Sequence, residues 1–162
     1  MHNNQSFSLT TGQATPSSQR GYKSRAEPLG KFEIPINPLR LALASGVSFI
    51  ARANARDPKQ TAKIIEKAIQ HKGFSFVEII QDCIIFNLDA NNKEERMFLV
   101  PGNGKRSKEE ASKLIEMYDY DSKKGRIPLG VLFSERRKTF EEQWPQLQEL
   151  QRKNKGWAEI KK

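Results

Sequence analysis

The chain has 162 residues, which suits one ordinary domain and excludes a large multidomain protein within this sequence. With 36% hydrophobic and 29% charged residues, it is expected to fold around a modest core and not to remain disordered. The 28 Lys and Arg against 19 Asp and Glu give a net charge of +9, so the surface should attract anions such as phosphorylated cofactors, nucleic acid, acidic proteins or anionic lipid.

The first segment, residues 1–31, predicts an irregular loop because it is rich in Ser, Thr, Gln, Gly and Pro. A structureless segment of this length is uncommon inside a compact domain, so it is either disordered or held by a ligand or partner. Within it, residues 3–9 alternate weakly between polar and apolar and fit the end of a strand.

Capping residues predict where the helices begin. Asn37 and Asp57 each precede a proline, which places a side-chain acceptor just ahead of a favourable first helical position. Ser107 lies three residues before a glutamate, as in a capping box. A last helix over 139–155 contains Pro145, which either kinks it or begins a second segment.

β-branched and aromatic residues predict strands at 47–52, 74–80 and 128–133. The strand at 74–80 alternates at first and is then continuously apolar, as a strand covered by helices would be. The order helix, strand, helix, strand implies a right-handed parallel crossover. We therefore expect an α/β fold with a mostly parallel sheet flanked by helices.

Several kinds of segment and site are excluded. No apolar run approaches the roughly 18 residues of a membrane span, and the first residues lack the charged and apolar regions of a secretory signal, so a cytoplasmic location is expected. The single cysteine, Cys83, cannot form an internal disulfide or alone provide a four-thiolate site. From the residues alone, its simplest interpretation is a small buried hydrophobe.

Local motifs are few. His2 and His71 are too far apart in sequence to suggest a metal site, and His71 fits a helix C-terminal residue favoured by the helix dipole. Residues 102–107 lack the spacing of a phosphate-binding loop and predict a turn. The basic clusters are interleaved with acidic residues and have no aromatic stacking pattern, which favours a solvated surface over a nucleic-acid interface; they lie at 123–126, 136–138 and 152–155.

Several separate segments occur in an order found in one family. They are residues 3–17, Pro28-Leu29-Gly30, Asn37-Pro38, residues 46–52, Asp57-Pro58, residues 71–78 and Cys83-Ile84-Ile85-Phe86-Asn87. This succession resembles the C-terminal half of the β subunit of 2-oxoacid:ferredoxin oxidoreductases, thiamine-diphosphate enzymes that oxidatively decarboxylate pyruvate, 2-oxoglutarate and related acids. The resemblance extends from residue 3 to about 87 and then thins to residues 128–133 and Phe140-Glu141-Glu142.

The resemblance implies the C-terminal part of a thiamine-diphosphate-binding fold. The family carries a GDG motif upstream of its paired asparagines, and this sequence contains no GDG, so we expect a fragment of a longer subunit. The implied organisation is a strand end with a cofactor and substrate loop at 1–36, an α/β core at 37–100 and a helix-strand-helix extension at 101–162.

The resemblance also implies a magnesium-diphosphate site near the start of the chain. Asn4 matches the amide ligand and Ser6 the backbone carbonyl ligand of Mg²⁺, while the Asp ligand would lie in the absent GDG. Phe7, Leu9 and Thr10 match the loop beside cofactor and substrate, although relatives usually have Tyr in place of Phe7. No catalytic side chain is assigned.

In the same way, Cys83 matches the fourth thiolate ligand of a [4Fe–4S] cluster whose other cysteines lie in the missing half. The implied function is oxidative decarboxylation of a 2-oxoacid, with electrons passing to ferredoxin. The implied partners are an α or fused α/γ subunit, ferredoxin and coenzyme A, with no membrane and no nucleic acid, and the fragment alone is expected to be inactive. The alternative is a non-catalytic basic module that binds nucleic acid or a protein partner.

Overall fold

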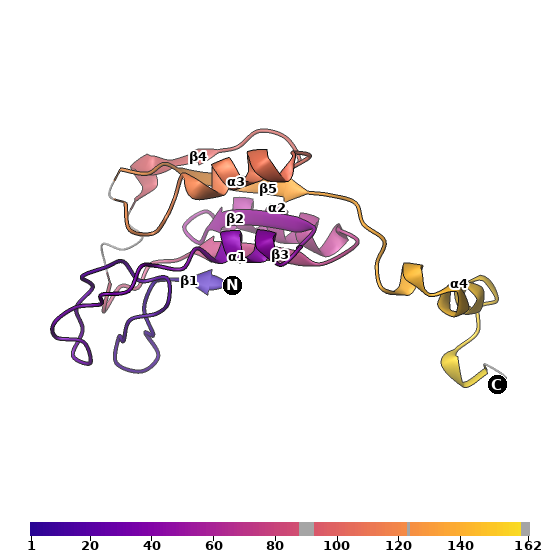
Figure 1. Ribbon diagram of the computed structural model, residues 1–162, viewed down its shortest axis with the longest axis horizontal. Coiled ribbons are helices and arrows are strands. Elements are labelled where there is room, and N and C mark those ends of the chain that lie inside the picture. The colour runs from indigo at the N-terminus through magenta and orange to yellow at the C-terminus, as the bar shows by residue number, and fades with distance from the viewer. Residues whose placement is uncertain (88–92, 123, 160–162) are drawn as a thin grey trace.

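The computed structural model describes residues 1–87, 93–122 and 124–159 (Figure 1). The strands are β1 (His2–Asn3), β2 (Phe49–Asn54), β3 (Ser75–Ile80), β4 (Met97–Leu99) and β5 (Ile127–Ser134). The helices are α1 (Pro38–Ala44), α2 (Pro58–Gln70), α3 (Lys108–Glu116) and α4 (Pro145–Arg152), with single 3₁₀ turns at Glu94–Arg96, Glu141–Gln143 and Trp157–Glu159. Among the described residues, no helix is long and apolar enough to cross a membrane.

The five strands form one sheet in the order β1-β3-β2-β5-β4. β3 pairs in parallel with both β1 and β2, and β4 pairs in parallel with β5. The β2–β5 pair is antiparallel, with a register shift after Ile50. α2 connects the parallel neighbours β2 and β3, as the crossover prediction requires. The expected α/β fold with a mostly parallel sheet is confirmed. β4 and β5 are parallel to each other and run antiparallel to β1, β2 and β3.

Helices cover both faces of the sheet. On one face, α1 and α3 pack Leu39 and Ile115 against Ile50 of β2. On the other, Ile64 of α2 packs against Ala51 and its neighbours in β2. Because successive strand residues point to opposite faces, β2 can supply both cores and is buried along its whole length.

The predicted helix starts agree with the structure, while other features differ from the sequence interpretation. The first long strand begins at Phe49 and not at residue 47, because its pairing with β3 starts at Phe49 opposite Ser75. The amides of Ser48 and Phe49 both donate to the Phe74 carbonyl, just before β3. Pro145 begins α4 and ends the preceding 3₁₀ segment, as expected for a residue without an amide hydrogen. α4 has no buried residue and lies away from the sheet at the end of an extended segment (Figure 1).

The segment before α1 lacks helix and strand after β1, as the composition predicts, yet it is well connected. Lys31 is buried, and its Nζ donates to the Ser18 carbonyl at 2.9 Å. The Lys31 backbone also pairs with Gly21 and Tyr22, and the Ile36 amide donates to the Pro16 carbonyl. Hydrogen bonds along its length therefore order this loop, which follows β1 at the edge of the sheet (Figure 1).

Replacing Asn37 by Ala is expected to lower the free energy of unfolding by about 1–2 kcal/mol. Its Oδ1 accepts the Leu39 and Arg40 amides at the start of α1, and its Nδ2 donates to the Ile115 and Tyr118 carbonyls. Urea unfolding followed by circular dichroism measures the loss. The control Asn37→Asp keeps the cap acceptor and should recover part of the stability; an Ala variant as stable as the parent would contradict this role.

Candidate functional site

A tight turn follows β1 at the carboxyl end of the parallel strands. His2 pairs with Ile79 and Asn3 with Ile80, so β1 ends beside the end of β3. In open α/β sheets, ligands bind just beyond the carboxyl ends of the strands. The turn reverses the chain through Gln5, whose φ of +55° is unusual for a residue other than glycine.

The turn orients two oxygen atoms. Asn4 is half-buried, its Nδ2 donates to Ser8 Oγ at 2.8 Å, and its Oδ1 accepts the Ser6 amide at 3.0 Å. An amide oxygen has two lone pairs, so Asn4 Oδ1 can still bind a cation. Within the described residues, no hydrogen bond is made to the Ser6 carbonyl oxygen. Two hard oxygen donors of the kind that Mg²⁺ prefers are therefore available here.

A hollow of about 660 Å³ opens over this turn. All five residues predicted to contact the cofactor line it, namely Asn4, Ser6, Phe7, Leu9 and Thr10. Backbone hydrogen bonds between Phe7 and both Gly12 and Gln13 close the loop that carries them. Phe7 is about half exposed and Leu9 is 99% exposed, so this wall of the hollow is apolar and open to a ligand or a partner.

Cys83 lies in a neighbouring turn and does not line the hollow. Its side chain is buried, and the Phe86 amide donates to Sγ at 3.3 Å. Burial raises the pKa of the Cys83 thiol, whereas hydrogen bonds from the backbone of residues 85–87 and from Ser8 lower it. The hydrogen bonds together outweigh burial, so the pKa lies below its usual value. This surrounding of N–H donors favours the thiolate, which is the form that binds metal.

The cysteine turn and the asparagine turn are in contact. Asn87 Nδ2 donates to the Gln5 carbonyl at 3.2 Å. The Phe86 ring lies so close to Gly12 that a Cβ on this glycine would come within 2.5 Å of Phe86 Cγ. Among the described residues, however, no group of three His, Cys, Asp or Glu could hold a metal. Further thiolates for a cluster would have to come from outside this chain, which has one cysteine.

A buried ion pair behind the turn was missed by the sequence interpretation. Arg52 of β2 and Glu78 of β3 are register partners, both are 0% exposed, and Arg52 Nε lies 2.7 Å from Glu78 Oε2. Tyr120 donates its hydroxyl to Glu78 Oε1 at 2.5 Å. Burial alone lowers the pKa of Arg52, but Tyr120 and Glu78 raise it above its usual value, so the guanidinium stays charged. The sequence did contain a signal for this pair. Each of two neighbouring apolar strands has a single charged residue, and the two charges are opposite.

Two other predicted features are present in the structure. His71 is the C-cap of α2, as expected, but its Nε2 lies 2.9 Å from Ser48 Oγ, and burial lowers the pKa of the imidazole. Burial therefore favours the neutral form of His71. Residues 102–107 form a turn with positive φ at Gly102 and Gly104, followed by the Ser107 capping box, as predicted.

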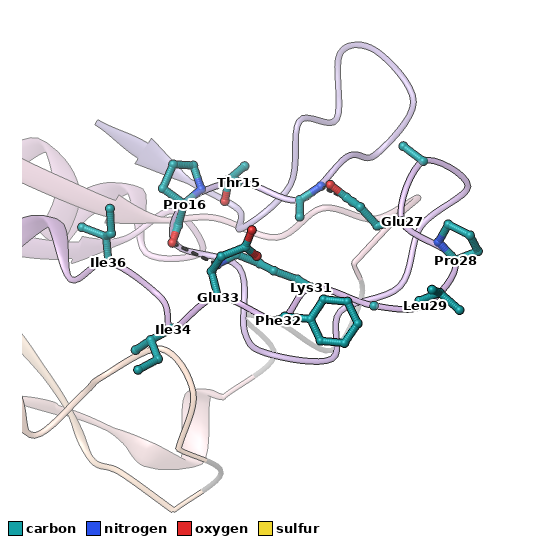
Figure 2. A pocket seen from close by; sticks show the side chains of 13 residues that line it. Thr15, Pro16, Glu27, Pro28, Leu29, Lys31, Phe32, Glu33, Ile34 and Ile36 are labelled. Atoms are coloured by element: carbon teal, nitrogen blue, oxygen red, sulfur yellow. Dashed lines mark hydrogen bonds between the residues drawn. The ribbon is translucent and has the colours of Figure 1, made fainter.

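A second hollow of about 600 Å³ lies between residues 14–16 and 26–36 (Figure 2). Leu29, Phe32 and Ile34 line it and are 75–80% exposed. Figure 2 also shows the hydrogen bond from Lys31 to the Pro16 carbonyl that joins the two segments. None of the predicted site residues lies here, and the lining is mainly apolar.

Lys93 is expected to make stability depend on pH. Its Nζ lies 3.4 Å from the Tyr118 hydroxyl, and burial, aided by the Arg96 charge, lowers the pKa of Lys93 from 10.5 to about 8. Between pH 8 and 10 the unfolded chain holds this proton and the folded chain releases it, so the free energy of unfolding rises with pH. Above pH 10 the raised pKa values of Tyr118 and Tyr120 oppose the rise.

Urea unfolding of the parent and of Lys93→Met at pH 8, 9 and 10 checks this expectation. The parent should gain stability relative to the variant as the pH rises. Parallel pH profiles for the two proteins would show that Lys93 keeps an ordinary pKa in the folded chain.

Comparisons with known proteins show which family this chain resembles. Residues 1–79 match the C-terminal TPP-binding domain of thiamine pyrophosphate enzymes. A 2-oxoacid:ferredoxin oxidoreductase β subunit from Saccharolobus solfataricus is 42% identical over 94 residues, which are 58% of this chain and 30% of that protein. A 2-oxoacid:ferredoxin oxidoreductase β subunit from Aeropyrum pernix is 34% identical over 158 residues, which are 88% of this chain and 49% of that protein.

A solved structure extends the likeness to nearly the whole chain. The 2-oxoglutarate:ferredoxin oxidoreductase from Magnetococcus marinus, with 2-oxoglutarate, coenzyme A and succinyl-CoA bound, superposes with a TM-score of 0.78 at 26% identity. The superposition covers 96% of this chain and 52% of that chain. This chain is homologous to the C-terminal half of 2-oxoacid:ferredoxin oxidoreductase β subunits. It spans about half or less of the length of these relatives.

Proposed function

We propose that the chain forms the C-terminal half of the thiamine-diphosphate-binding β subunit of a cytoplasmic 2-oxoacid:ferredoxin oxidoreductase. The observation that carries the proposal is that Asn4 and Ser6, each with an oxygen able to bind a cation, line a hollow just after β1. The match of residues 1–79 to a TPP-binding domain supports the same reading of this hollow.

In this proposal, Asn4 Oδ1 and the Ser6 carbonyl bind the Mg²⁺ that holds the cofactor diphosphate, and an Asp from the other half completes the protein ligands. Phe7, Leu9 and Thr10 form the wall beside cofactor and substrate. Bound thiamine diphosphate supplies the nucleophilic carbon for decarboxylation of the 2-oxoacid. The apolar side chains of Phe7 and Leu9 help to exclude water once the other half and the partner subunit cover them.

Cys83 is proposed as one thiolate ligand of a [4Fe–4S] cluster in the complete subunit. Support comes from the backbone N–H groups around Sγ and from the lowered pKa of this thiol. The link from Asn87 to Gln5 keeps the cysteine turn beside the proposed diphosphate site. When bound, such a cluster would supply the one-electron acceptor that this chemistry needs.

The proposed substrate is pyruvate, 2-oxoglutarate or a related acid. The proposed partners are the α or fused α/γ subunit, ferredoxin and coenzyme A. The 2-oxoglutarate and coenzyme A bound in the Magnetococcus marinus enzyme support this substrate class. Because the chain has one cysteine and lacks a GDG motif, it is proposed to be inactive alone.

The test is reconstitution. The chain is produced with the segment that precedes the matched region in the Saccharolobus solfataricus β subunit, together with the partner subunit of that enzyme. We expect methyl viologen reduction that needs a 2-oxoacid, thiamine diphosphate and Mg²⁺, and none from the chain alone. An assembled, folded complex that binds no thiamine diphosphate would refute the proposal.

A further inference from the structure

We propose that Glu78 is a positioning residue which, through Asn3, sets the turn that presents the Asn4 and Ser6 oxygens. The inference rests on the proposed function for its metal, but the geometry of the turn is independent of it. Glu78 belongs to β3 and is not a lining residue of the hollow, so it acts through its neighbour on β1.

The Glu78 carboxylate is held in one place. Arg52 Nε binds Oε2 at 2.7 Å and the Tyr120 hydroxyl binds Oε1 at 2.5 Å, with all three side chains at most 1% exposed. The Arg52 guanidinium also lies over the Tyr118 ring, 5.3 Å from its centroid. Charge-assisted hydrogen bonds of this kind fix orientation strongly in a buried site.

The Glu78 carboxylate, held by Arg52 and Tyr120, also binds Asn3. Glu78 Oε1 accepts a hydrogen bond from Asn3 Nδ2 at 2.7 Å, which settles which end of the amide faces the carboxylate. Asn3 Oδ1 therefore points the other way, where it accepts the Ser17 hydroxyl at 2.7 Å and the Gln5 amide at 3.2 Å. One acidic side chain thus determines where the acceptor for the Gln5 amide lies.

Gln5 is the residue that needs such support. A positive φ is energetically costly for a residue other than glycine. Such a conformation persists only where surrounding hydrogen bonds enforce it. The Gln5 amide is held by Asn3, and its carbonyl accepts Ser18 Oγ at 2.6 Å and Asn87 Nδ2 at 3.2 Å. Because Gln5 lies between Asn4 and Ser6, its backbone angles set the separation of the two proposed metal ligands.

A role in positioning also explains why a charged pair is buried here. Fully buried ion pairs add little net stability over apolar residues of the same size, because both charges lose their water. An apolar pair at these register positions could fill the space but could not orient Asn3.

The test compares Asn3→Ala with Glu78→Gln in two measurements. Asn3→Ala leaves the bonds of Glu78 to Arg52 and Tyr120 in place, so it keeps the proposal testable if Glu78→Gln does not fold. The control is Ile64→Val, a change in the hydrophobic cluster on the α2 face of the sheet.

The first measurement is amide hydrogen exchange by NMR on the full chain. The Ser6 amide is informative because its acceptor, Asn4 Oδ1, is untouched by either substitution. We expect its exchange to be at least about ten-fold faster in both variants, relative to the amides of β2, and unchanged in Ile64→Val. Ser6 exchange that follows only the global stability in Asn3→Ala would overturn the proposal.

The second measurement is the Mg²⁺ concentration for half-maximal thiamine diphosphate binding in the reconstituted subunit. This concentration should rise about 10–100-fold in Asn3→Ala, as it does when other residues that position a metal ligand are substituted. An unchanged concentration would overturn the positioning role. If the parent subunit binds no thiamine diphosphate, the proposed function fails, and Ser6 exchange still decides whether Glu78 and Asn3 set the turn.

Discussion

Replacing Arg52 by Met is expected to lower the free energy of unfolding by about 3–5 kcal/mol, a large fraction of the stability of an ordinary domain. The substitution keeps most of the side-chain volume but leaves the Glu78 carboxylate fully buried without its cation. The loss is measured by urea unfolding, with fluorescence and circular dichroism as separate probes.

Two further variants show that burial causes the loss. Arg56→Met removes an arginine that follows β2 and pairs with Asp82 and Glu94. Arg56 is 42% exposed in these pairs, so its loss should change stability little. The double variant Arg52→Met/Glu78→Leu should recover much of the loss, because no charge then remains unpaired. An Arg52→Met protein as stable as the parent would contradict the buried-pair account.

Replacing Asn4 by Ala is expected to weaken Mg²⁺-dependent thiamine diphosphate binding in the reconstituted subunit by about a hundred-fold or more. Substituting a residue that hydrogen-bonds a metal ligand already lowers metal affinity about 10–100-fold. Asn4 is the proposed ligand itself, so a larger loss is expected. Asn4→Asp retains an oxygen donor and should keep most of the affinity. Calorimetric titration measures both variants.

The matched control is Asn103→Ala, which removes an exposed asparagine in a turn outside the hollow. It should bind thiamine diphosphate as the parent does. Equal affinity in Asn4→Ala and Asn103→Ala would exclude Asn4 as a ligand, whatever the activity of the complex.

Local chemistry explains which parts of the fold could be predicted. The caps at Asn37 and Ser107 accept amides two or three positions away, so the sequence pattern contains the cap itself. The bonds from Asn37 Nδ2 to the Ile115 and Tyr118 carbonyls are long-range and are not contained in that pattern. The antiparallel pairing of β5 with β2 joins segments about 80 residues apart, and no local pattern specifies its direction. The start of β2 shifted for the same reason, because its pairing with β3, which starts at Phe49 opposite Ser75, is long-range.

The candidate site divides in a similar way. Residues Asn4 to Thr10 are consecutive, so a motif in one short segment could bring them to one hollow. The Arg52–Glu78 pair depends on the register between β2 and β3, which periodicity alone does not provide. The contact of the Cys83 turn with Gln5 depends on loop geometry, and loops have no sequence periodicity from which such a contact could be predicted. The predicted domain boundaries and ligand roles stay predictions.

The most direct test of the account is thiamine diphosphate titration of the reconstituted subunit, with Mg²⁺ present and with Mg²⁺ removed by a chelator. The account predicts saturable binding with Mg²⁺ that is lost on chelation and restored when Mg²⁺ is added back. Absence of binding with Mg²⁺, or equal binding after chelation, would contradict a magnesium-diphosphate site built on Asn4 and Ser6.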